Sequence, residues 1–391
     1  MERVIFHVDC NNFYASVECL LNPSLKNYAI AVAGDPNKRT GIILAKNYLA
    51  KAFGVKTGEA IWEAKQKCPT LICVAPKHEK YQEYSEKCHE IYYQYTDLIE
   101  PFGIDECWLD VTGSLKFFNC TPIELATKIQ KQVKDELGLS VSIGISWGKT
   151  LAKLGSDMKK PMGLTEINHQ NHLEILKKTK IEDMIMIGKH TAEKLRKMNV
   201  NTLFDLYSLT PSFLQAHFGV VGTYLFNAVN GIDDDKLITP KDEDTKSVGN
   251  GATAVHDMTT IDEIKNFLRD LASKVAKRLR VHGFKANTIH LGIKYADFTY
   301  SAMQNKKSVC FSNEQDIFNF AYEIFLALAG TKFAPVRALR ISVTNLTASG
   351  DNQQVNIFTN QKNENLCSAI DKLKDKFGED VISFAKDYKS F

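Results

Sequence analysis

The sequence predicts an α+β protein of several domains, and three observations support this. Outside residues 19–76, residues 1–165 follow the order strand, helix, hairpin, helix, strand. Residues 166–232 show only helical patterns, and a second α/β unit follows the acidic, polar segment 233–245. A length of 391 residues fits two to three domains.

The first predicted elements are a strand and a helix. The apolar run from Arg3 to Asp9 predicts a buried strand with Asp9 at its C-terminal edge. A helix is expected to begin at Phe13. The sequence therefore delivers one carboxylate at the end of an N-terminal strand.

The segment Pro101–Thr112 predicts a β-hairpin with two adjacent acids, Asp105 and Glu106, at its turn. Carboxylates this close repel each other unless a proton or a cation intervenes, and Mg²⁺ prefers oxygen ligands. An acidic turn exposed to solvent is the plainer interpretation. Together with Asp9, however, the hairpin would form a pocket of three carboxylates, which two-metal phosphoryl transfer needs.

The remaining elements of this part complete a ferredoxin-like βαββαβ pattern. A helix with tyrosines on its apolar face is expected from residue 77 to about residue 100. A second helix is expected over Pro122–Leu137, and Leu139–Ile145 alternates as a strand. The apolar face of the second helix comprises Ile123, Leu125, Ala126, Ile129 and Val133.

Residues 19–76 predict a small insert with strands at Ala29–Ala33 and Gly41–Ala45. A short helix, Lys46–Gly54, should follow and end at Gly54. Three side chains on this helix can reach an anionic ligand: Lys46, Tyr48 and Lys51. Later, Lys149–Pro161 opens a helix whose early positions can meet phosphate or metal.

The second α/β unit combines an amphipathic helix, Ile261–Val281, with strands at Thr288–Tyr295 and Leu339–Val343. The segment 274–307 holds eight Lys or Arg residues and one acid, Asp297. A sheet with one polar, basic face that is backed by helices suits contact with a phosphate backbone.

Composition narrows the class of protein. The 44% hydrophobic and 24% charged residues are typical of a globular protein, and no run of 18 apolar residues occurs. Nine cysteines without a Cys-x-x-Cys pair argue against zinc sites and disulfides. We expect a cytoplasmic monomer with no signal peptide and no membrane contact.

Three motifs resemble those of Y-family translesion DNA polymerases, in particular the bacterial DinB- and UmuC-like enzymes. They are Asp9–Glu18, Gly103–Glu106 and Lys153–Pro161, and the similarity runs in order over essentially the whole chain. The resemblance implies a right-hand polymerase for error-prone, template-directed synthesis. Its expected parts are a palm (1–18 and 77–165), fingers (19–76), a thumb (166–232), a linker (233–245), a little finger (246–350) and a C-terminal tail (351–391).

The resemblance also implies the site residues. Asp9, Asp105, Glu106 and the Cys10 carbonyl would hold two Mg²⁺ ions, with Mn²⁺ as a substitute. Tyr14 would act as a steric gate against the ribose 2′-hydroxyl, although it also suits a core aromatic. The other expected dNTP contacts are Phe13, Tyr48, Lys51, Asp157 and Lys160. Many relatives carry Arg at position 51, and Lys51 and Lys160 also suit ordinary solvated lysines.

DNA and protein partners are implied in the same way. Met186–Leu195 resembles a helix–hairpin–helix whose Gly188 turn would aim amide groups at a phosphate, although a plain helical turn also fits. The expected primer-template contacts in the little finger are Lys277, Arg278, Lys294 and Arg340. Gln354, Ile357 and Phe358 match a peptide that docks on bacterial sliding clamps, or they pack on the little finger as a tail strand.

Two other functions remain open from the sequence. A non-catalytic DNA-binding relative is disfavoured by the intact set of Asp9, Asp105 and Glu106. A nucleotidyl cyclase shares the palm topology, but it has no use for a thumb or for a basic C-terminal unit. Primer extension on a primed template distinguishes the three.

Overall fold

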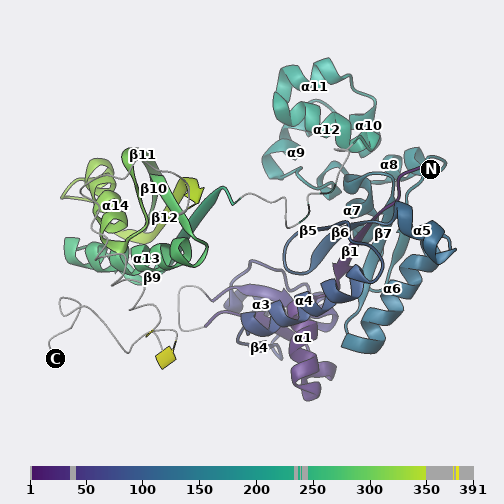
Figure 1. Cartoon of the computed structure of the whole chain (residues 1–391), viewed down its shortest axis with the longest axis horizontal. Coiled ribbons are helices and arrows are strands. Elements are labelled where there is room, and N and C mark those ends of the chain that lie inside the picture. The colour runs from purple at the N-terminus through teal and green to yellow at the C-terminus, as the bar shows by residue number, and fades with distance from the viewer. Residues whose placement is uncertain are drawn as a thin grey trace. The chain divides into compact units, whose positions relative to one another are not determined.

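The computed structural model describes residues 2–35, 41–232, 237, 239, 245–348, 373, 376 and 377 (Figure 1). These residues belong to two compact units, and the boundary between the units lies at residues 243–244. None of the described helices is long and apolar enough to cross a membrane.

A five-stranded sheet in the first unit carries the predicted ferredoxin-like pattern. Its order is β5-β6-β1-β7-β8, and neighbouring strands are antiparallel except β7 and β8. The strands are β1 Ile5–Cys10, β5 Ile99–Pro101, β6 Glu106–Asp110, β7 Val141–Ser146 and β8 Leu164–Glu166. The first four have the strand order of the βαββαβ fold, and β8 extends the sheet at one edge.

The helices around this sheet are α1 Phe13–Leu21, α4 His78–Tyr93, α5 Thr112–Phe118, α6 Pro122–Leu137 and α7 Lys149–Met158. The predicted bounds of α6 are confirmed, whereas α5 has no counterpart in the prediction. The predicted helix from residue 77 to about residue 100 is too long. Residues 99–101 instead pair with β6, and Pro101 disfavours helical backbone in the residue before it.

The two faces of the sheet have opposite character. Side chains alternate along β1, so Phe6 and Val8 enter an apolar core that α4 and α6 complete. His7 and Asp9 point the other way, where they meet Ser156 and Lys153 of α7. One face of β1 therefore builds the core and the other carries polar groups.

One burial prediction for this region is wrong. Ile123 is 48% exposed, because side chains tilt toward the helix N-terminus and a residue in the first turn extends past the packed part of α6. The predicted strand over Leu139–Ile145 is confirmed as β7, whose residues are all buried because α7 covers its second face. Ser142 and Ser146 on that face donate hydrogen bonds to Asn11 Oδ1 and to the Ile167 carbonyl, each at 2.9 Å.

Residues 19–76 form a small sheet of order β3-β2-β4. Its elements are η1 Pro23–Asn27, β2 Ile30–Ala33, β3 Ile43–Lys46, α2 Tyr48–Ala52, α3 Ile61–Lys67 and β4 Ile72–Val74. The sequence did not predict α3 and β4. Helix α2 is shorter than expected because Asn47 caps it, accepting a hydrogen bond from the Ala50 amide.

Helices follow β8, as the sequence predicted. They are α8 His172–Lys178, η2 Ile181–Asp183, α9 Lys189–Arg196, α10 Leu203–Tyr207, α11 Pro211–Phe218 and α12 Val220–Asn230. They enclose an apolar core of their own.

The second unit is an antiparallel sheet of order β11-β10-β12-β9 that α13 and α14 back on one face. Its elements are β9 Ser247–Met258, α13 Ile261–Val281, β10 Phe284–Tyr295, β11 Tyr300–Phe311, α14 Glu314–Ala329 and β12 Val336–Ala348. The predicted bounds of α13 are confirmed. The sequence did not predict β9, β11 and α14.

Helix α7 lies so close to β7 that no side chain fits between them at one point. A Cβ on Gly144 would lie 1.9 Å from the Ala152 carbonyl oxygen and 2.4 Å from the Ser156 amide nitrogen. A Cβ on Gly155 would lie 3.2 Å from the Gly144 Cα. This contact fixes the distance between α7 and the sheet.

We expect Gly144→Ala to destabilise the first unit, because the added methyl group forces α7 away from backbone atoms that cannot yield. Overpacking of this kind costs about 1–3 kcal/mol in unfolding free energy, which urea or thermal unfolding measures. Gly113→Ala in α5 is the matched control, since a Cβ there meets no atom within 4 Å. Equal stabilities of the two variants would contradict the close packing of α7.

Candidate active site

The end of β1 brings the three predicted acids together. Asp9 and Glu106 are direct partners in the antiparallel ladder of β1 and β6, so both carboxylates leave the same face of the sheet. Asp105 comes next, and its carbonyl oxygen accepts a hydrogen bond from the Cys10 amide at 2.9 Å. The acids line a pocket of about 370 Å³. Other lining residues include Cys10, Asn12, Phe13, Tyr14, Lys46 and Lys160.

The pocket concentrates negative charge. Burial, followed by the charges of Glu106 and Asp9, raises the pKa of Asp105 to about 6. Burial and a hydrogen bond with Glu106 also raise the pKa of Asp9. The acids therefore repel one another in a partly dehydrated site, which favours the binding of cations.

Two lysine side chains, Lys153 and Lys160, place positive charge beside the acids. Lys153 Nζ lies 3.3 Å from Asp9 Oδ2 and 3.0 Å from Glu106 Oε2. Lys160 Nζ lies 2.7 Å from Asp9 Oδ2 and 2.8 Å from Asp157 Oδ1. Burial by itself lowers the pKa of Lys153, but the charges of Glu106, Asp157 and Asp9 outweigh it and raise that pKa. Both lysines therefore stay charged beside the acids.

The sequence motif predicted roles for Asp157 and Lys160 but none for Lys153. Lys153 and Asp157 are four residues apart, which places them on one face of α7, and this spacing is the signal that could have identified Lys153. Lys160 lies beyond the end of the helix. Lys153 also pairs with Asp157 at 3.1 Å.

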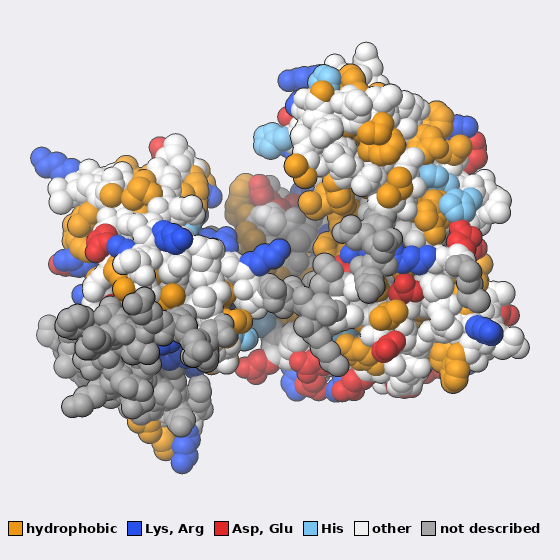
Figure 2. Space-filling view, turned by 45° about the horizontal axis from the view of Figure 1, so that its top comes forward, with side chains coloured by type: hydrophobic (Ala, Val, Ile, Leu, Met, Phe, Trp, Pro, Cys, Tyr) orange, Lys and Arg blue, Asp and Glu red, His pale blue; other side chains and the backbone are white. Residues whose placement is uncertain are grey.

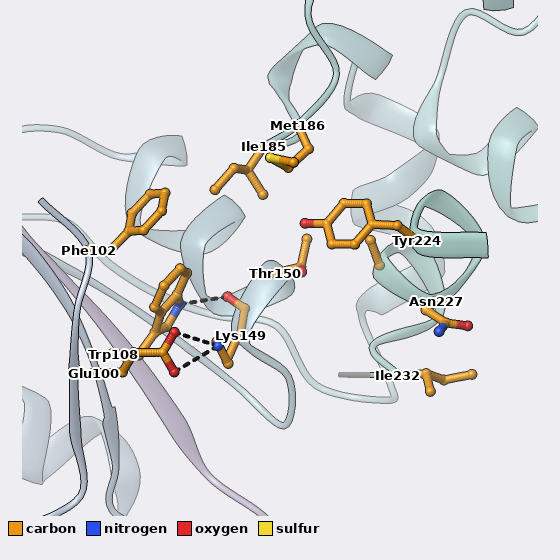
Figure 3. Close-up of a pocket in the computed structure, with 11 residues that line it drawn as sticks. Glu100, Phe102, Trp108, Lys149, Thr150, Ile185, Met186, Tyr224, Asn227 and Ile232 are labelled. Carbon is orange, nitrogen blue, oxygen red and sulfur yellow. Dashed lines mark hydrogen bonds and ion pairs between the residues drawn. The ribbon is translucent and has the colours of Figure 1, made fainter. Parts of the chain in front are cut away.

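The first residue of α7 contacts the sheet, while contacts of this turn with phosphate or metal stay a prediction. Lys149 pairs with both carboxylate oxygens of Glu100 on β5, at 2.7 and 2.8 Å. This pair lines a second cavity, of about 290 Å³, between the sheet and the helices at residues 172–230 (Figure 3). Trp108 donates its indole N–H to the Lys149 carbonyl at 2.9 Å. The first turn of α7 thus anchors the helix to the sheet, and its later residues meet the acids.

The donor set suits a hard divalent cation. Carboxylate oxygens and the Cys10 carbonyl are the ligand types that Mg²⁺ prefers, and a cation relieves the repulsion that raises the pKa of Asp105. Among the described residues, no three His, Cys, Asp or Glu side chains already form a metal-ligand arrangement. Lys153 and Lys160 hold the carboxylate oxygens instead, so a metal ion at Asp9 has to displace them.

Tyr14 and Phe13 both line this pocket, and Phe13 is also part of the buried core. The Tyr14 ring stacks on Tyr81 with ring centroids 4.1 Å apart and planes 14° apart. Burial, followed by the charge of Asp105, raises the pKa of Tyr14, so its phenol is neutral at physiological pH. Tyr14 therefore lines the same pocket as Asp9, Asp105 and Glu106.

Three side chains on α2 or just before it were predicted to contact an anion, and only one of them lines the pocket. The Tyr48 hydroxyl donates to Asn11 Oδ1 at 3.1 Å, and the Lys51 ammonium lies 5.6 Å from the centroid of the Tyr48 ring. Neither belongs to the lining of the pocket. Lys46 does, and it donates to Thr57 Oγ1 at 3.0 Å.

A buried histidine for which no role was predicted, His7, lies beside Glu106. His7 Nε2 is 3.4 Å from Glu106 Oε2, and its Nδ1 is 2.8 Å from Ser156 Oγ. Burial, followed by the charge of Lys153, lowers the pKa of His7 to about 3, so the imidazole is neutral. A single histidine within an otherwise apolar strand was the available signal.

The predicted DNA contacts are spread over both units. Gly188 is the N-cap of α9, whose first amide groups have no partner within the helix. In the second unit, Lys294 and Arg340 alternate with the buried residues of β10 and β12 and so lie on the face away from the helices. Lys277 and Arg278 lie on α13 instead.

Figure 2 shows several Lys and Arg side chains on the viewed face of the second unit, at the left. The predicted basic residues of this unit thus fall into two layers, the sheet and α13. Gln354, Ile357 and Phe358, which the sequence predicts to bind a clamp, lie outside the described residues, as does most of the predicted linker.

Three parts of the chain match known protein families. Residues 8–157 match the impB/mucB/samB family, and residues 245–357 match the C-terminal domain of that family. Residues 183–233 match the thumb domain of DNA polymerase-iota. The matched segments follow one another in the order that the resemblance implied.

Similar proteins extend the match to nearly the whole chain. DNA polymerase IV of Acetivibrio thermocellus is 40% identical over 383 residues, which cover 97% of this chain and 96% of the relative. DNA polymerase IV 1 of Bacillus subtilis is 35% identical over 384 residues, which cover 97% of this chain and 92% of the relative.

Among solved structures, the Y-family DNA polymerase chimera Dbh-Dpo4(243-245)-Dbh has the same fold. It aligns with a TM-score of 0.78 over 88% of this chain and 99% of the chimera, at 24% identity. The fold, the three domain matches and the near full-length identity to polymerase IV enzymes agree. The chain therefore belongs to the Y family of DNA polymerases.

Proposed function

We propose that this Y-family polymerase extends a primer 3′ end with deoxynucleotides from dNTPs, using Asp9, Asp105 and Glu106 as its catalytic acids. As a member of the family, the chain is a DNA-directed DNA polymerase of translesion synthesis that depends on a divalent metal ion. The observation that carries the site assignment is the direct pairing of Asp9 with Glu106, beside Asp105. We assign Mg²⁺ as the ion, with Mn²⁺ as a substitute, because every proposed ligand is an oxygen atom.

The proposed metal ligands are the carboxylates of Asp9, Asp105 and Glu106 and the carbonyl of Cys10. Bound there, two divalent ions would lower the pKa of the primer 3′-hydroxyl and neutralise charge on the triphosphate. The neutral His7 side chain and the Lys153 ammonium both lie beside Glu106, on the face of the sheet that α7 covers. Glu106 is the acid that we assign to the primer hydroxyl.

The basic side chains of the pocket suit a triphosphate. Lys160 and Lys46 line the pocket, and the ammonium of Lys160 now pairs with Asp9. A cation bound to that carboxylate would leave the ammonium free to bind another anion. A released ammonium can then bind phosphate oxygens as a point charge. Asp157 positions both Lys153 and Lys160. Tyr48 and Lys51 keep a proposed role in dNTP binding, although neither lines the pocket of the acids.

The proposed domain roles follow the family. Residues 1–18 and 77–165 are the palm, 19–76 the fingers, 166–232 the thumb and 246–350 the little finger. Primer-template DNA would contact the Gly188 turn and the basic face of β10 and β12. Docking of Gln354, Ile357 and Phe358 on a sliding clamp and a cytoplasmic location remain proposals from the sequence.

We expect Asp105→Asn and Glu106→Gln each to reduce primer extension by about 1,000-fold or more, while binding of primed DNA survives. Removing one charged ligand from a metal site forfeits several kcal/mol of transition-state stabilisation. Extension assays and a DNA-binding titration measure the two effects. Asp135→Asn, on the exposed side of α6, is the matched control. Normal extension by either active-site variant would refute the assignment.

Tyr14→Ala should increase the use of ribonucleotides relative to deoxynucleotides by about tenfold to a hundredfold. The reason is that the truncated side chain no longer excludes a 2′-hydroxyl from the pocket. The measurement is kcat/KM for matched rNTP and dNTP pairs. An unchanged ratio would identify Tyr14 as a packing residue.

Neutralising Lys294, Lys306 and Arg340 together should flatten the salt dependence of duplex binding by about 2.7 in the log–log slope, if each contacts one phosphate. All three lie on the sheet face of the second unit. The comparison variant neutralises Lys277 and Arg278 on α13. A slope that changes only in the comparison variant would assign DNA binding to the helix layer.

A further inference from the structure

We propose that Tyr81 determines sugar specificity indirectly, by holding the Tyr14 ring in the plane that excludes a ribose 2′-hydroxyl. The inference rests on the proposed gate role of Tyr14. It assigns the rigidity of the gate to a second tyrosine that lies 67 positions later in the sequence (81 − 14) and is fully buried. Tyr81 is thus a positioning residue, since it acts on the substrate through Tyr14.

The contact spans one turn of α1. Tyr14 and Glu18 are four residues apart, so their side chains leave the same face of the helix. Tyr81 of α4 lies across both of them. Its ring stacks on Tyr14 at 4.1 Å, and its hydroxyl donates to Glu18 Oε1 at 2.8 Å. The stacking and the hydrogen bond fix both ends of the Tyr81 side chain.

Glu18 anchors the Tyr81 hydroxyl. Its carboxylate is fully buried, and its second oxygen accepts an ion pair from Lys77 Nζ at 2.6 Å. A buried carboxylate that loses a partner is costly, so the Tyr81 hydroxyl is held strongly in place. Burial, together with the Glu18 carboxylate, raises the pKa of Tyr81 well above its usual value, which keeps the hydroxyl protonated as a donor.

His78 closes the remaining side of the cluster. Its ring is nearly perpendicular to those of Tyr14 and Tyr81, with interplanar angles of 86° and 80°. The ring centroids lie 6.0 Å and 5.8 Å apart, respectively. The Tyr14 ring is therefore restrained on one face by Tyr81 and along an edge by His78. Its other surroundings include the pocket of the acids. A ring free to tilt would leave room for the 2′-hydroxyl, so steric exclusion depends on this backing.

The test measures kcat/KM for matched rNTP and dNTP pairs in variants of Tyr81. Tyr81→Leu removes the stacking ring but keeps apolar volume, and we expect the ribo-to-deoxy ratio to rise about threefold to tenfold, the range that corresponds to one aromatic pair. Tyr81→Phe keeps the ring and removes the hydroxyl, so we expect a smaller rise in the same direction. Glu18→Gln, which weakens the same hydrogen bond, should resemble Tyr81→Phe.

Tyr84→Leu is the matched control. It makes the same substitution one turn further along α4, at a partly buried tyrosine whose ring contacts Lys87. This variant should destabilise the enzyme less than Tyr81→Leu, because Tyr84 is only partly buried, and it should leave the sugar ratio unchanged. A ratio that rises equally in both variants would overturn the inference, because it would reflect general loosening of α4.

The decisive comparison repeats Tyr81→Leu and Tyr81→Phe in a Tyr14→Ala background. If Tyr81 acts through Tyr14, neither substitution changes the ratio further. A further rise would show that Tyr81 acts on the nucleotide independently and would overturn the inference. If Tyr14→Ala raises the ratio but the single Tyr81 variants do not, only the inference fails. If Tyr14→Ala itself leaves the ratio unchanged, the gate assignment fails first.

Discussion

The structure of the site depends on one constraint: Asp9 and Glu106 face each other directly across two antiparallel strands, with Asp105 next in the chain. Like charges opposite one another destabilise a ladder, so this pair exists only where cations offset it. In the chain itself the cations are Lys153 and Lys160, both supplied by α7 and the residues after it. The same repulsion favours the binding of a divalent ion in the pocket.

The need to bring lysines to the acids explains the packing of α7. Gly144 and Gly155 allow the helix backbone to approach β7 without an intervening side chain. The pair of Lys149 with Glu100 anchors the start of the helix, away from the acids. The polar face of the sheet is thus covered by a helix whose two ends have different tasks. One end is structural and the other supplies the charges of the site.

The apolar face supplies rigidity of another kind. Helices α1 and α4 pack there, and their contact holds Tyr14, Glu18 and Tyr81 in one cluster at the edge of the pocket. Charge compensation and the proposed sugar gate therefore lie on opposite sides of β1. The second unit has its own core, and the DNA contacts proposed for its basic face do not involve the acids.

The sequence by itself determined the ferredoxin-like order, the bounds of α6 and α13 and the family, because strong periodicity and three ordered motifs are local signals. It also identified the three acids, which two of these motifs contain, although the roles of the acids remain predictions. Only the tertiary structure decided how distant residues meet. The role of Lys153, the contact of His7 with Glu106 and the stacking of Tyr81 on Tyr14 depend on strand register and helix packing. Contacts between residues far apart in the chain leave no periodic pattern, so they cannot be predicted from a single sequence in this way.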